Sequence, residues 1–241
     1  MDALENESAT VLVHHRSIGE SQDPFGTEAG DVRWMDLYGE TSAEAASGLQ
    51  RAAPSVVFDG HRFVAGSAPQ GDSLESDYTE MLADKHNFRN NMPNYCCSSN
   101  FTWTGDNSSG TLEWSAILPA PWNMGWTTRL MVVEHSAYFP DGSNGMEYYE
   151  DVVRMVVDLQ VDAYPGPDGL NDGFQTYGGT EDIQLPAAWD GDDLSLVVVH
   201  EWEDAMIWDP EPESPDSGFL PGFLAPLGLI ALGAAALARR E

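Results

Sequence analysis

Hydrophobic and polar residues alternate most regularly in the second half of the chain. Between Thr111 and Leu118 every second residue is apolar, namely Leu112, Trp114, Ala116 and Leu118. Because successive side chains of a strand point to opposite faces, this pattern predicts a strand with one buried face. Three runs rich in valine, Arg129–His135, Asp151–Val161 and Leu194–Trp202, also predict strands, although the second of them fits a helical period as well. Turns with glycine, aspartate and proline separate these runs, which is typical of an antiparallel β-sandwich.

The first half of the chain mixes strand and helix patterns. Ala9–His15 and Ser55–Asp59 are short, apolar, β-branched runs typical of buried strands, and we expect them to lie in one sheet. Arg62–Ala65 follows the second run after a turn and predicts a hairpin. Glu28–Tyr38 has apolar residues at helical spacing and predicts a helix.

A second helix is predicted after this hairpin. Asp72 and Glu75 have the three-residue spacing of a capping box. The apolar residues that follow form one stripe, comprising Leu74, Tyr78, Met81, Leu82 and Phe88. The fold class is therefore α+β: an α/β domain over residues 1–92 and an antiparallel β-sandwich over residues 98–207.

The C-terminal segment, residues 219–241, predicts a transmembrane helix. Phe219–Ala238 contains no charged residue, and Arg239 and Arg240 follow it. A helix of this length reaches about 30 Å, the thickness of a bilayer core. A core helix would normally show a polar face, whereas this segment has none. The arginines place the C-terminus in the cytoplasm, with membrane lipid as the partner of the helix and the bulk of the chain outside the cell.

Residues 208–218, just before this segment, are rich in proline and acid and predict a stiff, solvated stalk. The stalk, the tripeptide Pro221-Gly222-Phe223, the apolar helix and the basic end together resemble the PGF-type C-terminal sorting signals of archaeal surface proteins. In that family a membrane peptidase removes the tail and a lipid replaces it. The resemblance implies a protein that is anchored at the cell surface.

Three segments of the first half, VLVHHRS, DPFGTEAGDVRWMDLYG and APSVVFDG, give the order strand, helix and hairpin. They resemble the C-terminal two-thirds of a thioredoxin fold and, more closely, the outer-membrane-protein-twenty-eight-related family of thioredoxin-like surface proteins. In the second half, VVEH, DGSNG and VVRM resemble the sandwich that follows in that family. The resemblance implies that Pro54 is the cis proline that faces the redox cysteines.

By the same resemblance, the first strand and the C-x-x-C motif of the family would lie before Met1, so the α/β domain is an incomplete thioredoxin-like domain. Disulfide exchange needs an attacking thiolate, and this domain carries no cysteine near that position. Met1–His15 also lacks the basic and apolar regions of a signal sequence. We expect the chain to be a fragment, or its start to have been placed too late.

Charge and cysteine content narrow the function further. Forty acidic residues and ten basic ones give a formal net charge of -30, which argues against nucleic-acid binding. The charge fits a solvated surface or one that collects cations. The cysteines, Cys96 and Cys97, are adjacent, which is neither a disulfide scaffold nor a C-x-x-C motif. A vicinal disulfide, two thiols and pairing outside this chain all remain open.

Sequence motifs for catalysis and metal binding are incomplete. His200 and Glu201 begin an H-E-x-x-H motif, but residue 204 is aspartate. His14 and His15 end a predicted buried strand and are interpreted as structural. The aspartate-rich turns do not match the spacing of an EF-hand, so they are interpreted as solvated turns, with calcium as a candidate cofactor; they comprise Asp141–Asn144, Asp168–Asp172, Asp190, Asp192 and Asp193.

Several tryptophans of the second half are predicted at the core or rim of the sandwich, namely Trp114, Trp122, Trp126 and Trp189. An exposed aromatic cluster there would instead indicate a ligand-binding platform. The leading hypothesis is a membrane-anchored, extracytoplasmic surface protein that binds a protein or glycan partner without catalysis. The alternatives are an exported thiol-disulfide oxidoreductase whose C-x-x-C end is missing, and a calcium-stabilised adhesion module.

Overall fold

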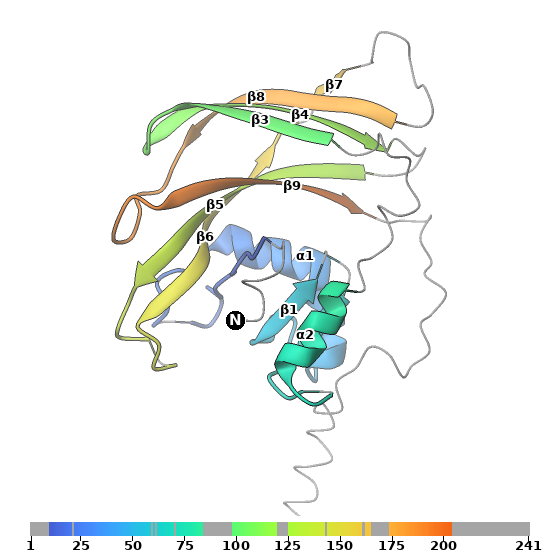
Figure 1. The fold of residues 1–241 in the computed structure, drawn as a ribbon, viewed down its shortest axis with the longest axis vertical. Helices are drawn as coiled ribbons and strands as arrows, with labels where there is room; N and C mark the ends of the chain where they lie inside the picture. Colours follow the sequence, from blue (N-terminus) through green and yellow to red (C-terminus); the bar gives the residue numbers. More distant parts are fainter. Residues whose placement is uncertain are drawn as a thin grey trace, which may run out of the picture. The chain divides into compact units, whose positions relative to one another are not determined.

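The computed structural model describes residues 10–203 except residues 21, 59, 61, 70, 84–97, 120–124, 143, 161 and 165–173. This part of the chain has a mixed α+β fold with two helices and antiparallel sheets (Figure 1). It divides into two compact units: the described residues of the first lie within Trp34–Ala83, and those of the second lie within residues 10–33 and 98–203.

The first unit is built around one hairpin and one helix. β1 (Ser55–Phe58) and β2 (Arg62–Ala65) pair in antiparallel fashion, and α2 (Leu74–Ala83) follows them. Phe58 and Val64 form the buried centre of a small core. The residues that pack against this centre include three members of the predicted helical stripe, namely Tyr78, Met81 and Leu82. The predicted hairpin and second helix are therefore confirmed.

α1 (Glu28–Ala45) is longer than the helix predicted from the sequence. From Trp34 onward it belongs to the first unit, where the Trp34 indole Nε1 donates to the carbonyl oxygen of Gln50 at 3.2 Å. The Trp34 and Phe63 rings lie 5.9 Å apart. The Ala53–Pro54 peptide bond, which leads into β1, is cis, the isomer that the family resemblance assigns to Pro54.

The start of α2 differs from the prediction. The hydroxyl oxygen of Ser73 accepts a hydrogen bond from the backbone N–H of Ser76 at 3.1 Å, so Ser73 is the N-cap. The predicted capping box of Asp72 and Glu75 is wrong by one residue. The first turn of the helix needs a side-chain oxygen to accept a backbone N–H. Asp72 and Ser73 are adjacent and both carry such an oxygen, and Ser73 is the one that is used.

The second unit contains two sheets. One has the order β3 (Ser98–Gly105), β4 (Ser109–Pro119), β8 (Phe174–Gln184) and β7 (Asp162–Tyr164). The other has the order β6 (Tyr148–Leu159), β5 (Gly125–Tyr138) and β9 (Leu194–Glu203). All neighbouring strands in both sheets are antiparallel.

The two sheets enclose a shared core, which is the arrangement of a β-sandwich (Figure 1). The four alternating residues of β4 are all buried: Leu112, Trp114, Ala116 and Leu118. They cluster with Leu130 of β5 and Leu159 of β6. The alternation in the sequence therefore predicted both the strand and its buried face correctly. Asp151–Val161, the run with the ambiguous period, is largely strand β6.

The run predicted as a strand at Ala9–His15 has a different partner from the one expected. Val13 forms an isolated parallel bridge with Val152 of β6, donating to the Asp151 carbonyl at 2.9 Å and accepting from the Val153 N–H at 3.0 Å. Leu12 packs against Met131 and other apolar residues of the β6-β5-β9 sheet. The expectation that this run shares a sheet with Ser55–Asp59 is wrong for the described residues. The outer edge of β6 offers backbone partners to Val13, and the apolar face of the sheet partly covers Leu12.

Several predicted features lie outside the described residues. They are the stalk at residues 208–218, the transmembrane segment at residues 219–241, Pro221, Gly222, Phe223, Cys96, Cys97, Trp122 and the turn Asp168–Asp172. Within the described ranges, neither helix combines the length and hydrophobicity that crossing a bilayer requires.

Candidate functional site

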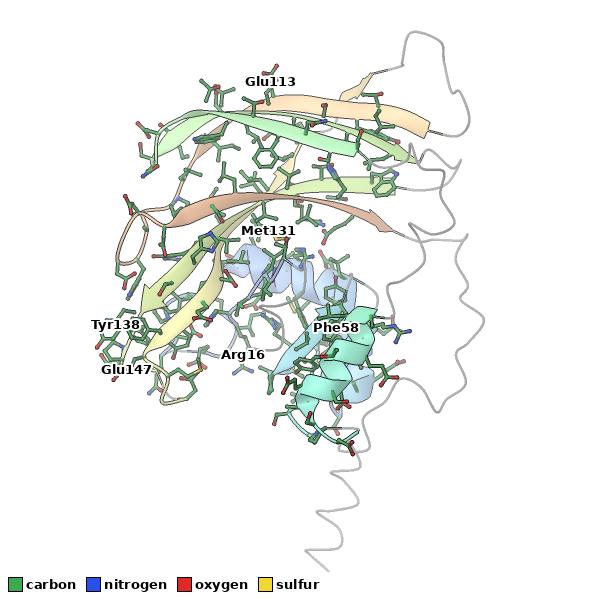
Figure 2. All side chains as sticks on the ribbon, in the orientation of Figure 1. Arg16, Phe58, Glu113, Met131, Tyr138 and Glu147 are labelled. Atoms are coloured by element: carbon green, nitrogen blue, oxygen red, sulfur yellow. The ribbon has the colours of Figure 1, made fainter. Side chains whose placement is uncertain are left out.

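The end of β5 and the start of β6 form a two-stranded ribbon that extends beyond the part of β5 that pairs with β9. Pairing of β5 with β9 stops at Glu134, whereas its pairing with β6 continues to Tyr138. Tyr138 pairs with Tyr148 across the ribbon, and their ring centroids lie 5.0 Å apart. The two tyrosines are 41% and 58% exposed, respectively. Figure 2 shows Tyr138 and Glu147 at this free end of the ribbon.

One face of the ribbon is exposed and the other is buried. Ser136 pairs with Glu150 two residues along the strands from the Tyr138–Tyr148 pair, and these four residues are exposed. The intervening residues, Ala137 and Tyr149, are buried. We call the exposed set Ser136, Tyr138, Tyr148 and Glu150 the tyrosine face. Strand alternation places these side chains on the same side, so the two rings and one carboxylate are presented together.

A buried aromatic cluster supports the ribbon from its other face. Phe25 is almost fully buried against Ala137, Tyr149 and Val152. The His15 ring lies 5.4 Å from both the Phe25 and Tyr149 rings, and its Nδ1 pairs with Asp23 Oδ2 at 2.5 Å. His15 therefore has the structural role that was predicted for it, because packing and a carboxylate occupy its ring.

A fully buried carboxylate, Glu134, joins β5 to the loop before β9. It accepts hydrogen bonds from the Arg154 guanidinium and from the backbone N–H of Trp189, the latter at 2.6 Å. The register shifts between Val132 and Val133, which leaves Arg154 as the extra residue of a β-bulge. Bulges redirect side chains, and here the redirected guanidinium also lies 5.5 Å from the centroid of the Phe25 ring.

The loop that begins at Trp189 borders the tyrosine face along β5. The indole Nε1 of Trp189 donates to the Tyr138 carbonyl oxygen at 2.8 Å. Asp190 accepts from the Tyr138 N–H at 2.8 Å, and Asp193 accepts from the Ser136 N–H at 2.9 Å. The Trp189 ring packs edge-on against Phe25, on the other face of the ribbon, and remains 42% exposed.

The surroundings of the tyrosine face are acidic. Neither Tyr138–Glu150 nor Pro186–Asp193 contains a lysine or arginine. The exposed acidic residues of these two segments are Asp141, Glu147, Glu150, Asp190 and Asp192. The face therefore offers aromatic rings and carboxylate acceptors. Both kinds of group are suited to contacts with a partner molecule.

His200 and Glu201 lie together on β9 but do not form a metal site. His200 Nε2 is 2.7 Å from Ser99 Oγ, and its Nδ1 is 3.0 Å from Thr128 Oγ1. Burial lowers the pKa of His200 below its ordinary value, which favours a neutral ring. In a Ser-His-Asp triad the second ring nitrogen of the histidine is bonded to a carboxylate. Here that nitrogen faces the hydroxyl of Thr128, so Ser99, His200 and Thr128 differ from such a triad. Glu201 is held by Arg33 and Arg129.

The aspartate-rich turns show no metal centre in the described part of the chain. No group of three or more histidine, cysteine, aspartate or glutamate side chains there is arranged to hold an ion. Asp190 and Asp193 each use an oxygen on the backbone of β5. These two aspartates therefore support the end of β5 beyond its pairing with β9.

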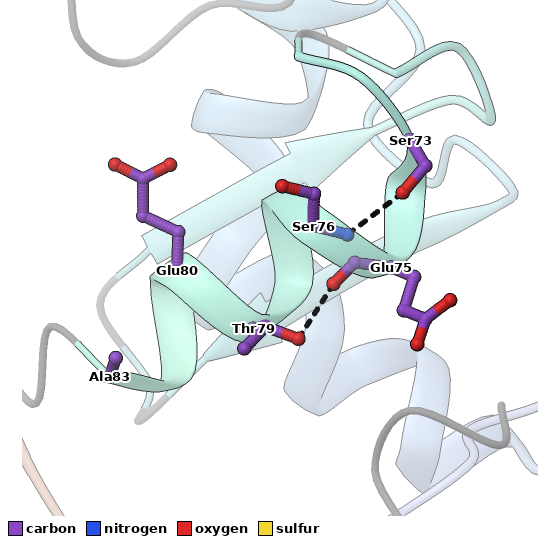
Figure 3. Close-up of a pocket in the computed structure, with 6 residues that line it drawn as sticks. All are labelled: Ser73, Glu75, Ser76, Thr79, Glu80 and Ala83. Carbon is purple, nitrogen blue, oxygen red and sulfur yellow. Dashed lines mark hydrogen bonds between the residues drawn. The ribbon is translucent and has the colours of Figure 1, made fainter.

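A shallow hollow runs along α2 and is not a convincing binding site (Figure 3). Its residues come from that one helix and its cap, and no residue of α2 is buried. Ser73 caps the helix, and Thr79 donates its hydroxyl to the Glu75 carbonyl at 2.8 Å. The hydroxyl groups of these two residues are used by the helix itself.

The sequence identified only part of this site. Trp114 is buried and Trp126 packs against the core, as predicted, whereas Trp189 is substantially exposed at the ribbon end. Tyr138 and Tyr148 were not singled out. The available signal was the placement of tyrosines on both sides of the turn DGSNG, where a hairpin would pair them.

Comparisons with known proteins do not add an assignment. No protein-family model matches the chain, and neither a curated protein nor a solved structure matches it.

Proposed function

We propose that this chain is a non-catalytic, extracytoplasmic binding module, held at the cell membrane by residues 219–241, that recognises its partner through the tyrosine face. The observation that carries the proposal is the exposed pair of Tyr138 and Tyr148. Contiguous exposed aromatic side chains are typical of interaction sites, and tyrosine is enriched among the residues that dominate binding energy.

The rigidity of this surface supports a binding role. The ribbon rests on the buried ring of Phe25, and its edge is fixed by hydrogen bonds from the loop that contains Trp189. Glu134 in turn fixes that loop. A backbone that is already held in place loses little conformational entropy when a partner binds.

Two finer assignments belong to the same proposal. The first unit is an incomplete thioredoxin-like domain, which the order α1, β1, β2 and α2 supports. The anchor is supported by the charge-free run Phe219–Ala238 and by Arg239 and Arg240. Together they give a surface protein whose sandwich carries the binding function.

The test compares binding to immobilised cell-envelope material by biolayer interferometry. The variant Tyr138→Ala/Tyr148→Ala should lose most of the binding shown by the unaltered chain. Phe101→Ala is the matched control, because Phe101 is an aromatic residue of β3 with 44% exposure, close to that of Tyr138. Equal binding by all three proteins would refute a role for the tyrosine face.

A further inference from the structure

We infer that the tyrosine face binds an arginine-bearing segment of a partner polypeptide, with a guanidinium stacked on the Tyr138–Tyr148 pair. This inference rests on the proposed function and adds the chemistry of the ligand. Three properties of the surface lead to it: the exposed ring faces, the exposed acids around them, and the absence of lysine and arginine from the two segments that form the site.

The rings provide the first part of the recognition. Tyr148 is 58% exposed and stands beside Tyr138 at 5.0 Å between centroids. The ring face of tyrosine carries negative electrostatic potential and attracts a cation placed over it. A flat guanidinium can stack on such a ring while its N–H groups point outward at the edge, which a lysine ammonium cannot do.

The carboxylates provide the second part. Glu150 lies two residues from Tyr148 on the same exposed face, and the exposed Glu147 immediately precedes Tyr148 in the sequence. An arginine stacked on Tyr148 therefore has the Glu150 carboxylate on the same face to accept its outward N–H groups, and Glu147 adds negative charge nearby. Asp190 lies beside β5, where its carboxylate accepts a hydrogen bond from the Tyr138 N–H.

Charge decides between an arginine-bearing partner and a neutral glycan. Sugars also stack on aromatic rings, and their hydroxyl groups donate hydrogen bonds to carboxylates. A neutral sugar, however, is not attracted by the net negative charge of the surface. Five exposed acids lie in the two segments, without a lysine or arginine among them, on a chain of net charge -30. A cationic partner relieves the repulsion among these acids and is steered toward them over a distance.

The test uses the whole chain in detergent and defined probes in isothermal titration calorimetry. The probes are a blocked peptide with four Gly-Arg repeats, the same peptide with lysine, the same with glutamate, and a neutral oligosaccharide. We expect the arginine peptide to bind most tightly, the lysine peptide about tenfold more weakly, and the glutamate peptide not to bind. Raising the salt concentration should weaken binding without abolishing the preference for arginine.

Variants assign the binding to the residues named. Tyr148→Leu keeps an apolar side chain but removes the aromatic ring, and it should weaken binding of the arginine peptide about tenfold. Glu147→Gln/Glu150→Gln should weaken it and flatten its salt dependence. Phe101→Ala and Glu113→Gln, which alter exposed residues of the other sheet, should stay within about twofold of the unaltered chain. Thermal melting curves verify that each variant is folded.

Contradictory outcomes separate this inference from the proposed function. Arginine-peptide binding that Tyr148→Leu leaves unchanged, or no binding of that peptide at low salt, would overturn the inference. Oligosaccharide binding that depends on Tyr148, without peptide binding, would also overturn it while keeping the proposed function. Failure of the envelope-binding test described above would remove the proposed function itself.

Discussion

The buried carboxylate of Glu134 should make a large contribution to stability, because three groups depend on it. It neutralises Arg154 and accepts the backbone N–H groups of Trp189 and Asp190. Its side chain is fully buried, and that of Arg154 is 13% exposed. Breaking a buried pair by removing one partner costs about 3–5 kcal/mol, since the remaining charge stays uncompensated.

Three variants test this value. Glu134→Leu should lower the free energy of unfolding by about 3–5 kcal/mol, a large share of the roughly 5–15 kcal/mol typical of a domain. Glu134→Gln keeps an acceptor but loses the charge, so it should cost about 1.5–3 kcal/mol. Glu134→Leu/Arg154→Met removes both charges and should be more stable than Glu134→Leu alone.

The assay is urea unfolding followed by far-UV circular dichroism, with amide hydrogen exchange at Trp189 as the local readout. Exchange at this amide should accelerate in both single variants, because the amide loses a charged acceptor. Glu113→Gln, at an exposed position of β4, is the matched control and should change stability by less than about 0.5 kcal/mol. A Glu134→Leu variant as stable as that control, or a double variant less stable than the single one, would refute the reasoning.

Three further predictions concern pH, the tail and redox chemistry. Burial lowers the pKa of His200 in the folded state, so on acidification the unfolded state takes up this proton first. The free energy of unfolding should therefore fall as the pH drops below about 6.5. Urea unfolding at several pH values should show a weaker fall in the variant His200→Gln. Cells producing the whole chain should retain it in the membrane fraction, and deletion of all residues after Gly218 should release it to the medium; an immunoblot that finds both forms in the same fraction would contradict the anchor. Insulin-reduction assays should show no turnover, and any turnover abolished by Cys96→Ser/Cys97→Ser would make the vicinal cysteines a redox centre.

Local patterns in the sequence predicted much of the fold. β4 was predicted with its buried face because Leu112, Trp114, Ala116 and Leu118 alternate strictly with polar residues. The hairpin of β1 and β2 and both helices also followed from local spacing. β8 was not predicted, because Phe174–Gln184 carries polar residues and two glycines in place of an apolar alternation. Its strand state depends on pairing with β4, which a local pattern does not contain.

Long-range pairing explains the remaining differences. The apolar run before Arg16 looked like a buried strand, but nothing in it specified β6 as the partner. The tyrosine face depends on the register of β5 against β6, and a bulge at Arg154 changes that register partway along. Trp189 reaches the same site from a loop far away in the sequence. The hairpin turn could therefore have indicated the tyrosine pair, but not the contacts of Phe25 and Trp189 that support it.

The bridge between Val13 and Val152 has a consequence for the order in which the protein folds. Residues 10–33 belong with the sandwich, yet the described residues of the first unit, within Trp34–Ala83, are synthesised before any strand of that sandwich. The first unit has local contacts and is able to fold as it emerges, since nearby pairings form fastest. The segment around Leu12 and Phe25 must wait with its apolar side chains exposed until β6 has been made. Apolar surface that is exposed during folding is prone to aggregate, so a pause in translation after the first unit would prolong this exposure.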